Sequence, residues 1–396
     1  MCNVSTTKII AKVLKIKSSK NPLPLSLPLP LPLMLANPHR LFFLMTALFG
    51  TLAMALWLAG LRGGMAYDSN WHGHEMIFGF VGATFAGFLL TAVPRWTNQP
   101  GLKGGWLAGL FGVWALGRLT MAFGGPIWLD LLFLPILFVV VLRQIVIARN
   151  WRNLAIPVML VMMTALNGLY HLGEAIIDPG TVLRASVYTA TVMIVLIGGR
   201  VMPSFTGNAL GVKIEEGRFA GALETASILA VFTVAVLSLL APDSAVHGAA
   251  ALVAGVVLGL RMIGWRSAAT WRLPIVWVLH LGYVWLPIGY LLTGFAEIWG
   301  WLDPSAALHA LTAGAIGVMI LAMATRASLG HGGREIHADW ATITAYVCVI
   351  AAAGMRVFAP PEWIEAAAVA WIVGYGLFVC AFWPVLTRPR VDGKPG

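Results

Sequence analysis

Residues 71–97 read WHGHEMIFGFVGATFAGFLLTAVPRWT, and this stretch decides the kind of solvent that the chain requires. Between its polar ends it is almost wholly apolar, and ~20 apolar residues at ~1.5 Å each are enough to cross ~30 Å of hydrocarbon as a helix. Similar stretches recur along the chain with short polar joints between them. With 59% apolar and only 11% charged residues, a soluble globule is excluded. We expect an all-α, polytopic membrane protein in contact with a lipid bilayer.

The apolar stretches predict a bundle of about 12 transmembrane helices. Together they form one transmembrane domain over residues 38–386, which leaves no room for a sizeable soluble domain, and residues 387–396 form a cytoplasmic tail. The predicted helices cover residues 40–60, 72–94, 105–122, 126–148, 153–177, 181–203, 219–240, 244–264, 272–298, 304–326, 337–357 and 362–384.

The first 37 residues differ from the rest of the chain. A lysine-rich run precedes a Leu/Pro repeat over residues 22–33, and proline at every second position prevents a helix. A cleaved signal peptide is the rival interpretation, but the segment has no uninterrupted apolar core and no small-residue cleavage site. We therefore expect residues 1–37 to be a disordered extension without function, or the product of an over-long gene start.

The 26 lysines and arginines indicate the orientation. If the N-terminus is cytoplasmic, all of them except Arg62, Arg118, Arg184 and Arg356 fall on the cytoplasmic side, as the positive-inside rule and an even number of spans require. We predict that both termini are cytoplasmic. The net charge of +10 does not indicate a nucleic-acid partner, because the basic residues are scattered over the joints between spans.

The second predicted span opens with the densest polar cluster on any of the helices, which contains His72, His74 and Glu75. At ~100° per residue the two imidazoles of a regular helix point ~200° apart. They can therefore serve two neighbouring sites, but they share one ion only if the first turn unwinds. The alternative interpretation is a pair of rim histidines in the headgroup zone.

Other histidines lie on three further spans. His171 belongs to a polar stripe on the fifth span, His309 is backed by small residues on the tenth, and His280 reaches mid-membrane on the ninth. An ionisable side chain within a span is a functional candidate, although a satisfied core histidine is an equally good interpretation of His280 or His309 taken singly. We expect His72, His171 and His309 to share a cofactor layer near the outer face.

Two Arg-Gly clusters close spans on the predicted cytoplasmic side, GGRVMPSFTGN at 198–208 and ATRASLGHGGR at 324–334. Arg200 and Arg326 are candidates for binding anionic groups such as haem propionates or lipid phosphates. Positive-inside anchoring explains both arginines equally well.

Imidazole without nearby thiolates suits haem iron and copper among the redox metals, and zinc among the others. The three cysteines stand far apart and are expected to be inert packing residues. Because no CxxCH motif occurs, any haem is expected to be non-covalent haem b. The candidate metal ligands are His72, His74, His171, His280 and His309.

The chain also contains the motifs NPHRLFFLMTALFG, NGLYHLGE and HALTAGAIGVMILAMATRASLGHGGR. With these motifs, the histidine-containing stretch at 71–97 and the Arg-Gly cluster at 198–208, the chain resembles the NnrS family. The resemblance covers residues 37–384. It implies a haem- and copper-containing protein of the bacterial inner membrane, linked to denitrification, nitrosative stress and the nitric oxide response, whose electron donor is unknown. The residues that match the family motifs are His72, His74, Glu75, His171, Arg200, Pro203, His309, Arg326, Gly330 and His331.

Three functions follow from this reading of the sequence. The leading one is redox handling or detoxification of nitric oxide or of nitrosylated species by a haem/copper oxidoreductase, with no catalytic residue assigned. The second is a metal or small-solute transporter, because twelve spans often consist of two repeated halves. The third is a non-catalytic haem-based sensor. A visible spectrum of the purified protein with added nitric oxide separates the first function from the third.

Overall fold

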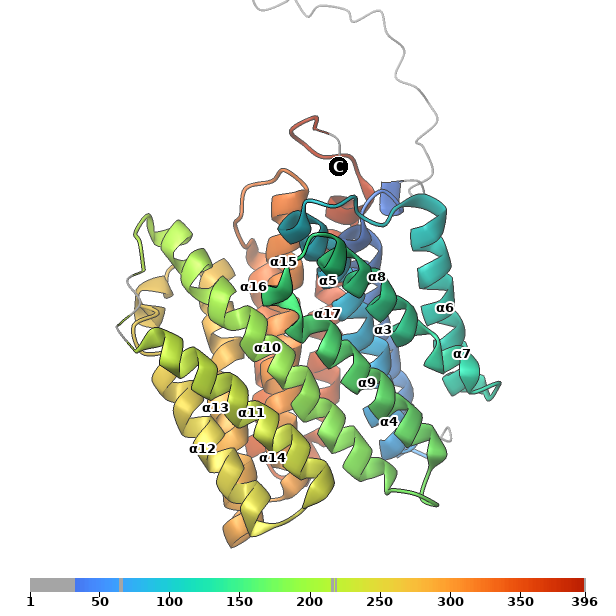
Figure 1. Cartoon of the computed structure of the whole chain (residues 1–396), viewed down its shortest axis with the longest axis vertical. Helices are drawn as coiled ribbons and strands as arrows, with labels where there is room; N and C mark the ends of the chain where they lie inside the picture. Colours follow the sequence, from blue (N-terminus) through green and yellow to red (C-terminus); the bar gives the residue numbers. More distant parts are fainter. Residues whose placement is uncertain (1–32, 64–66, 215–216, 218, 395–396) are drawn as a thin grey trace, which may run out of the picture.

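The computed structural model describes residues 33–394 apart from 64–66, 215–216 and 218. The described residues form a bundle of helices without strands (Figure 1). Eleven helical segments are long and apolar enough to cross a membrane, and a twelfth, α12 (Ala245–Arg261), is apolar but shorter. The predicted fold class, a polytopic all-α membrane protein, is confirmed.

The spans of the first half follow one another with short connections. They are α3 (Pro38–Leu61), the composite α4 (Ser69–His74), η1 (Glu75–Val81) and α5 (Gly82–Thr97), then α6 (Gly104–Phe123), the pair α7 (Trp128–Leu131) and α8 (Phe133–Ile147), η2 (Trp151–Asn153) with α9 (Ala155–Leu172), and α10 (Pro179–Leu210).

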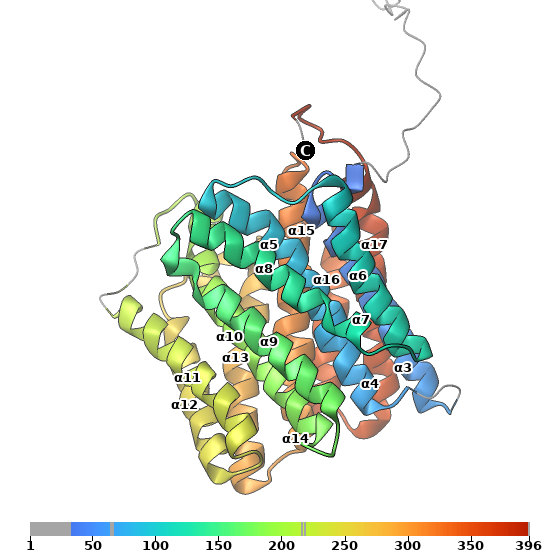
Figure 2. The same cartoon turned by 45° about the vertical axis from the view of Figure 1, so that its right-hand side comes forward.

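The second half begins after residue 219. Its elements are α11 (Ala220–Leu240), α12, η3 (Ser267–Thr270), α13 (Pro274–Trp299), the composite α14 (Pro304–His309), η4 (Ala310–Gly317) and α15 (Val318–His331), then α16 (Trp340–Phe358), η5 (Pro361–Trp363) and α17 (Ile364–Thr387). Figures 1 and 2 both place α11 and α12 at one edge of the bundle.

Local sequence explains where the boundaries depart from the prediction. The span predicted over 153–177 ends at Leu172 because Gly173 has a φ of 70° and a ψ of −171°, a backbone conformation outside the helical region that glycine adopts readily. The span predicted over 126–148 is divided at Leu132, because Pro135 has no N–H to bond with the carbonyl group of Leu131.

Two spans change their helical type directly after a histidine. In each, an aspartate caps the first turn, a histidine follows six residues later, and the helix then widens into a π-helical segment: Asp68, His74 and η1 in one, Asp303, His309 and η4 in the other. Wide turns of this kind are rare and occur often at functional sites. The histidine end of each of these two spans therefore differs from a regular α-helix.

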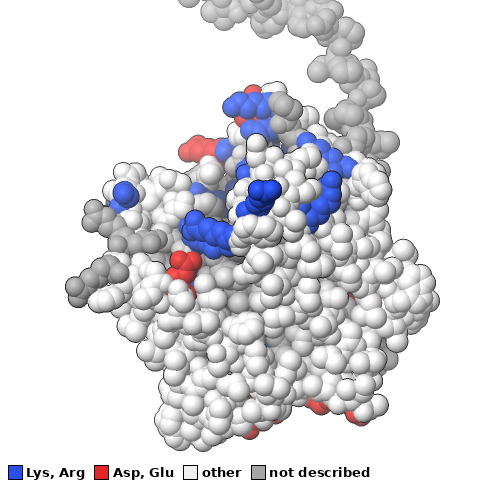
Figure 3. Space-filling model, in the orientation of Figure 1, with Lys and Arg blue, Asp and Glu red and all other residues white. Residues whose placement is uncertain are grey.

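The two ends of the bundle differ in charge. Figure 3 shows lysines and arginines gathered at one end, while the charged residues visible at the opposite end in this view are acidic. Of the arginines, the exposed Arg62 and the partly exposed Arg184 belong to that opposite end. The start of α3 and the end of α17 both lie at the end with the lysines and arginines (Figure 1), as an even number of spans requires. We call the end that carries most of the lysines and arginines the basic end, and the opposite end the distal end.

The first and last spans lie side by side. Arg40, at the start of α3, is buried and donates hydrogen bonds to the carbonyl oxygens of Leu386 (2.9 Å) and Arg388 (2.8 Å). Packing begins before this helix, because Met34 is buried and the backbone N–H of Gly104 donates to the carbonyl oxygen of Leu35 at 2.9 Å. The packed region thus starts within the predicted extension 1–37, most of which lies outside the described residues.

Candidate metal centre

Three potential metal ligands from three spans meet at the distal end of the bundle. Nε2 of His171 lies 2.8 Å from Oδ2 of Asp130, and Nε2 of His74 lies 3.3 Å from the same oxygen. One ligand atom from each residue falls within 4.8 Å of the other two. Two imidazoles and a carboxylate form a ligand set suited to copper, zinc or non-haem iron.

A second carboxylate and an arginine surround this set. Oε1 of Glu75 accepts hydrogen bonds from Nδ1 of His74 at 2.9 Å and from Arg118 at 2.5 Å. Arg118 also forms an ion pair with Asp130. The other oxygen of Glu75, Oε2, is buried and has no hydrogen-bond partner among the described residues. A carboxylate that holds the second nitrogen of an imidazole is the usual partner of a metal-bound histidine.

The hydrogen-bond partners of His74 define its protonation. Nδ1 faces the Glu75 carboxylate, and Nε2 faces Oδ1 of Asn167 at 3.0 Å as well as the Asp130 carboxylate. Asn167 in turn donates to Asp130 at 2.9 Å. Because all these neighbours of His74 are acceptors, Nδ1 carries a proton and Nε2 carries either a proton or a metal ion.

The charges of the cluster lead to the same conclusion. Glu75 and Asp130 bring two negative charges and Arg118 brings one positive charge, all in buried positions. With neutral imidazoles the cluster holds one uncompensated negative charge, which is costly inside a membrane. A positive charge at His74 or His171, from a proton or from a metal ion, balances it.

Small residues and polar anchors hold these side chains in place. The side chain of Asp68 caps α4, and Nε1 of Trp71 donates to the carbonyl oxygen of Met121 on α6 at 3.0 Å. Gly79 gives Arg118 room to reach Glu75, since a Cβ there would lie 3.1 Å from Cδ of Arg118 and would collide with Phe49. The start of α4 is therefore tied to α6, which carries Arg118.

A second group, formed by His72, His309 and Arg356, also lies at the distal end. Nδ1 of His309 donates to the carbonyl oxygen of Ser305 at 2.7 Å, and Arg356 donates to the hydroxyl of Ser305 at 2.6 Å. His72 interacts electrostatically with His309 and Arg356, and its ring lies 4.5 Å from that of Trp57. Nδ1 of His72 and Nε of Arg356 are buried without hydrogen-bond partners among the described residues.

The expected layer of His72, His171 and His309 is thus divided between two groups. His74 and His72 take part in different ones, as expected for imidazoles that point apart on one helix. His171 joins His74 and Asp130, whereas His309 joins His72.

The remaining predicted residues lie away from both groups. His280 is buried, and its ring nitrogens bond to the hydroxyls of Ser267 and Thr206, both at 2.9 Å. These contacts are typical of a satisfied core histidine. Arg200 donates to Asn153 at 2.9 Å. Arg326 and His331 lie at the basic end, where His331 accepts a hydrogen bond from Arg95 at 2.9 Å.

The residue at the middle of the candidate centre, Asp130, was not among the predicted site residues. Its signal was present in the segment IWLDLLFLP, residues 127–135, because a carboxylate inside an apolar span is a functional candidate by default. Arg118 was noted only as an exception to the charge asymmetry. The contacts of Asp130 and Arg118 with the other residues of the centre could not be predicted from their spacing in the sequence, because the neighbours of a span depend on how the bundle packs.

Comparison with known proteins bears on the family of the chain. A comparison with curated proteins gives no match. A model of the NnrS protein family matches residues 33–390. The match spans nearly the whole described chain and includes every residue of the candidate metal centre. The chain therefore belongs to the NnrS family.

Proposed function

We propose that this membrane protein of the nitric oxide response handles nitric oxide or a nitrosylated species by redox chemistry at copper and haem b. The observation that carries the proposal is the buried cluster of two imidazoles and two carboxylates around Arg118. Copper and haem iron are the one-electron metals that such imidazole donors bind well.

Copper is assigned to His74, Asp130 and His171. Each of these residues offers one ligand atom, with His74 and Asp130 buried and His171 partly buried. The Glu75 carboxylate holds Nδ1 of His74 and would leave Nε2 to bind an ion. A cation there also balances the excess negative charge of the cluster. Zinc and non-haem iron fit the same ligands and are separated from copper by elemental analysis.

Haem b is assigned to His72 and His309. Nδ1 of His309 donates to a backbone carbonyl, which leaves the lone pair of Nε2 available for iron. The described residues give His72 no hydrogen-bond partner at its buried Nδ1. Arg356 adds a positive charge that suits a propionate group. When bound, haem supplies the reactivity toward nitric oxide.

The proposed location is the bacterial inner membrane, with the basic end in the cytoplasm. The positive-inside rule gives this orientation from the arginines and lysines seen at that end in Figure 3. The distal end, with both histidine groups, then faces the periplasm. Nitric oxide is small and apolar enough to arrive through the lipid, so the site needs no wide aqueous channel.

The test uses the full chain produced in cells supplied with copper and haem, with elemental analysis and a visible spectrum of the purified protein. His171→Ala is expected to lose copper and keep the Soret band, whereas His309→Ala is expected to lose the Soret band and keep copper. His280→Gln, a buried histidine outside both groups, is the matched control and should change neither.

Wild-type protein with neither copper nor iron would overturn the redox proposal. Zinc at the His74 centre without a Soret band would favour a metal transporter. A Soret band that shifts with nitric oxide, without consumption of the gas under reducing conditions, would favour the non-catalytic sensor.

A further inference from the structure

A slot enters the bundle from the basic end between α3, α5, α10 and α15, and its deep part reaches η1 and η4. Its outer part has a volume of about 450 Å³ and its deeper part about 80 Å³. The two parts are adjacent, because they share four lining residues: Phe43, Phe88, Val201 and Met323. The slot lies at the end of the molecule opposite to both histidine groups.

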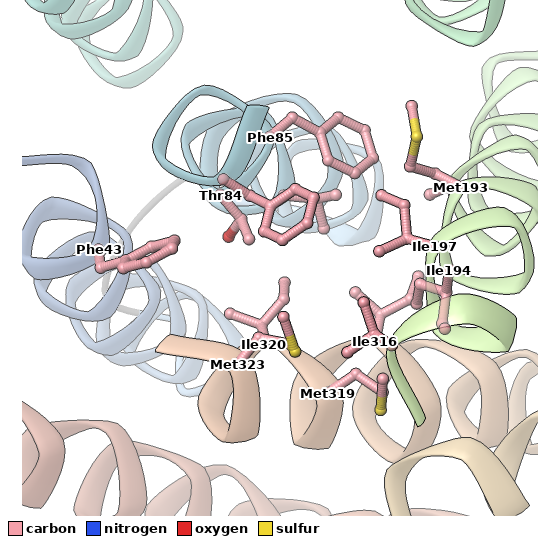
Figure 4. Close-up of a pocket in the computed structure, with 15 residues that line it drawn as sticks. Phe43, Thr84, Phe85, Met193, Ile194, Ile197, Ile316, Met319, Ile320 and Met323 are labelled. Carbon is pink, nitrogen blue, oxygen red and sulfur yellow. The ribbon is translucent and has the colours of Figure 1, made fainter. Parts of the chain in front are cut away.

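The deep part of the slot is apolar. Figure 4 shows methionine, isoleucine and phenylalanine side chains from several helices pointing into a common space. The hydroxyl of Thr84 already donates to the carbonyl oxygen of Phe80 at 3.0 Å. This part therefore suits a hydrocarbon chain rather than a polar group.

The mouth of the slot is basic. Arg95, Arg326 and His331 line it, and no aspartate or glutamate is found among the described residues that do so. Arg95 donates to Nδ1 of His331, and Arg326 is half-buried with its guanidinium carbon 4.0 Å from the centre of the Phe205 ring. Neither arginine has a carboxylate partner among the described residues.

Two guanidinium groups without counter-charges above an apolar channel match an amphiphile with a negative head. Guanidinium binds phosphate oxygens in pairs and with high strength. Arg95 lies in the last turn of α5, and Arg326 lies five residues before the end of α15. Both are therefore near the basic ends of their spans, where a bilayer places its headgroups. A zwitterionic lipid fits less well, because its ammonium group is repelled by the two arginines.

We propose that the slot binds one anionic phospholipid, with its phosphate at Arg95 and Arg326 and part of one acyl chain in the deep apolar part. The ring of Phe205 and the imidazole of His331 position the two guanidinium groups at the mouth. The site stands on residues separate from the candidate metal centre, so either assignment can fail without the other.

The test measures the thermal unfolding midpoint of the purified full chain in a neutral detergent as phosphatidylglycerol is added. Phosphatidylglycerol is expected to raise the midpoint, and phosphatidylcholine at equal concentration is not. Arg326→Gln is expected to raise the half-saturating concentration about tenfold, because one charged hydrogen-bonding partner is lost. Arg334→Gln removes a basic residue of the same end that does not line the slot, and should leave the response unchanged.

A second variant tests the acyl chain. Ile197→Trp fills the deep part without changing the arginines, and is expected to abolish the effect of phosphatidylglycerol while keeping a single size-exclusion peak and the wild-type metal content. An unchanged response would show that the lipid binds only at the surface and would overturn the proposal. Equal shifts of the unfolding midpoint with the two phospholipids would overturn the proposal as well. An equally large shift with oleate, or loss of bound haem in Arg326→Gln, would do the same.

Discussion

Arg118 and Asp130 form an ion pair within the membrane-spanning bundle, with only 7% and 2% of their surfaces exposed. The same aspartate accepts hydrogen bonds from His171 and Asn167, and the same arginine reaches Glu75. The pair therefore links α6 to α7 and supports the two histidines of the candidate metal centre. Its removal should affect stability and metal content together.

Arg118→Leu is expected to destabilise the protein by about 3–5 kcal/mol, because it leaves two buried carboxylates without their counter-charge. Unfolding in detergent mixtures measures the loss. Arg184→Leu is the control, since Arg184 pairs with Asp243 in an exposed position and such pairs contribute less than about 1 kcal/mol. Equal effects of the two substitutions would show that the buried pair has no special role.

Glu75→Gln is expected to weaken copper binding about 10–100-fold, because an amide holds the imidazole of His74 less firmly than a carboxylate does. Asp130→Asn should weaken binding further, since it changes a proposed ligand itself. Competition with a chelator of known affinity measures both constants. If Glu75→Gln bound copper as tightly as the wild type, its contact with His74 would be structural only.

Copper affinity is expected to rise with pH across the range in which imidazoles lose their protons, because the ion replaces a proton at Nε2 of His74 and of His171. Titration calorimetry in buffers of different ionisation enthalpy counts the protons released. His171→Ala should reduce that number. A pH-independent affinity without proton release would place the metal on other ligands.

Much of this organisation could be predicted from the sequence, because the length of an apolar helix is set by bilayer thickness. The common depth of His74 and His171 follows from counting residues along their helices. The contact of both with Asp130, and the electrostatic interaction of His72 with His309, depend on which spans are neighbours. Packing over the whole bundle decides which spans are neighbours, so no local sequence motif predicts it.

Removing residues 2–32 is expected to leave metal content and stability unchanged, whereas removing residues 2–36 should lower stability. The longer deletion takes away buried Met34, worth about 1.5–3 kcal/mol if its burial is complete, and the carbonyl group of Leu35 that accepts from Gly104. Comparison of the two truncations by thermal unfolding tests this boundary. Equal stability of the two would place the start of the packed region after residue 36.

A reporter that is active only in the cytoplasm is expected to function when fused after the last residue. A periplasmic reporter inserted in the connection 241–244 should also function, because α11 and α12 meet there at the distal end. The positive-inside rule sets both expectations. The reverse pattern of activities would invert the proposed orientation and place both histidine groups toward the cytoplasm.

The π-helical segments η1 and η4 lie between the histidine end of each composite span and its basic end, which forms the mouth of the slot. A wide turn acts as a one-residue insertion, so the angular phase of the helix before it is offset from the phase after it. Deleting one residue there would rotate one end relative to the other by ~100°. A single insertion or deletion at η1 or η4 would therefore turn the histidines to new neighbours, while the end of the span that forms the mouth of the slot keeps its register.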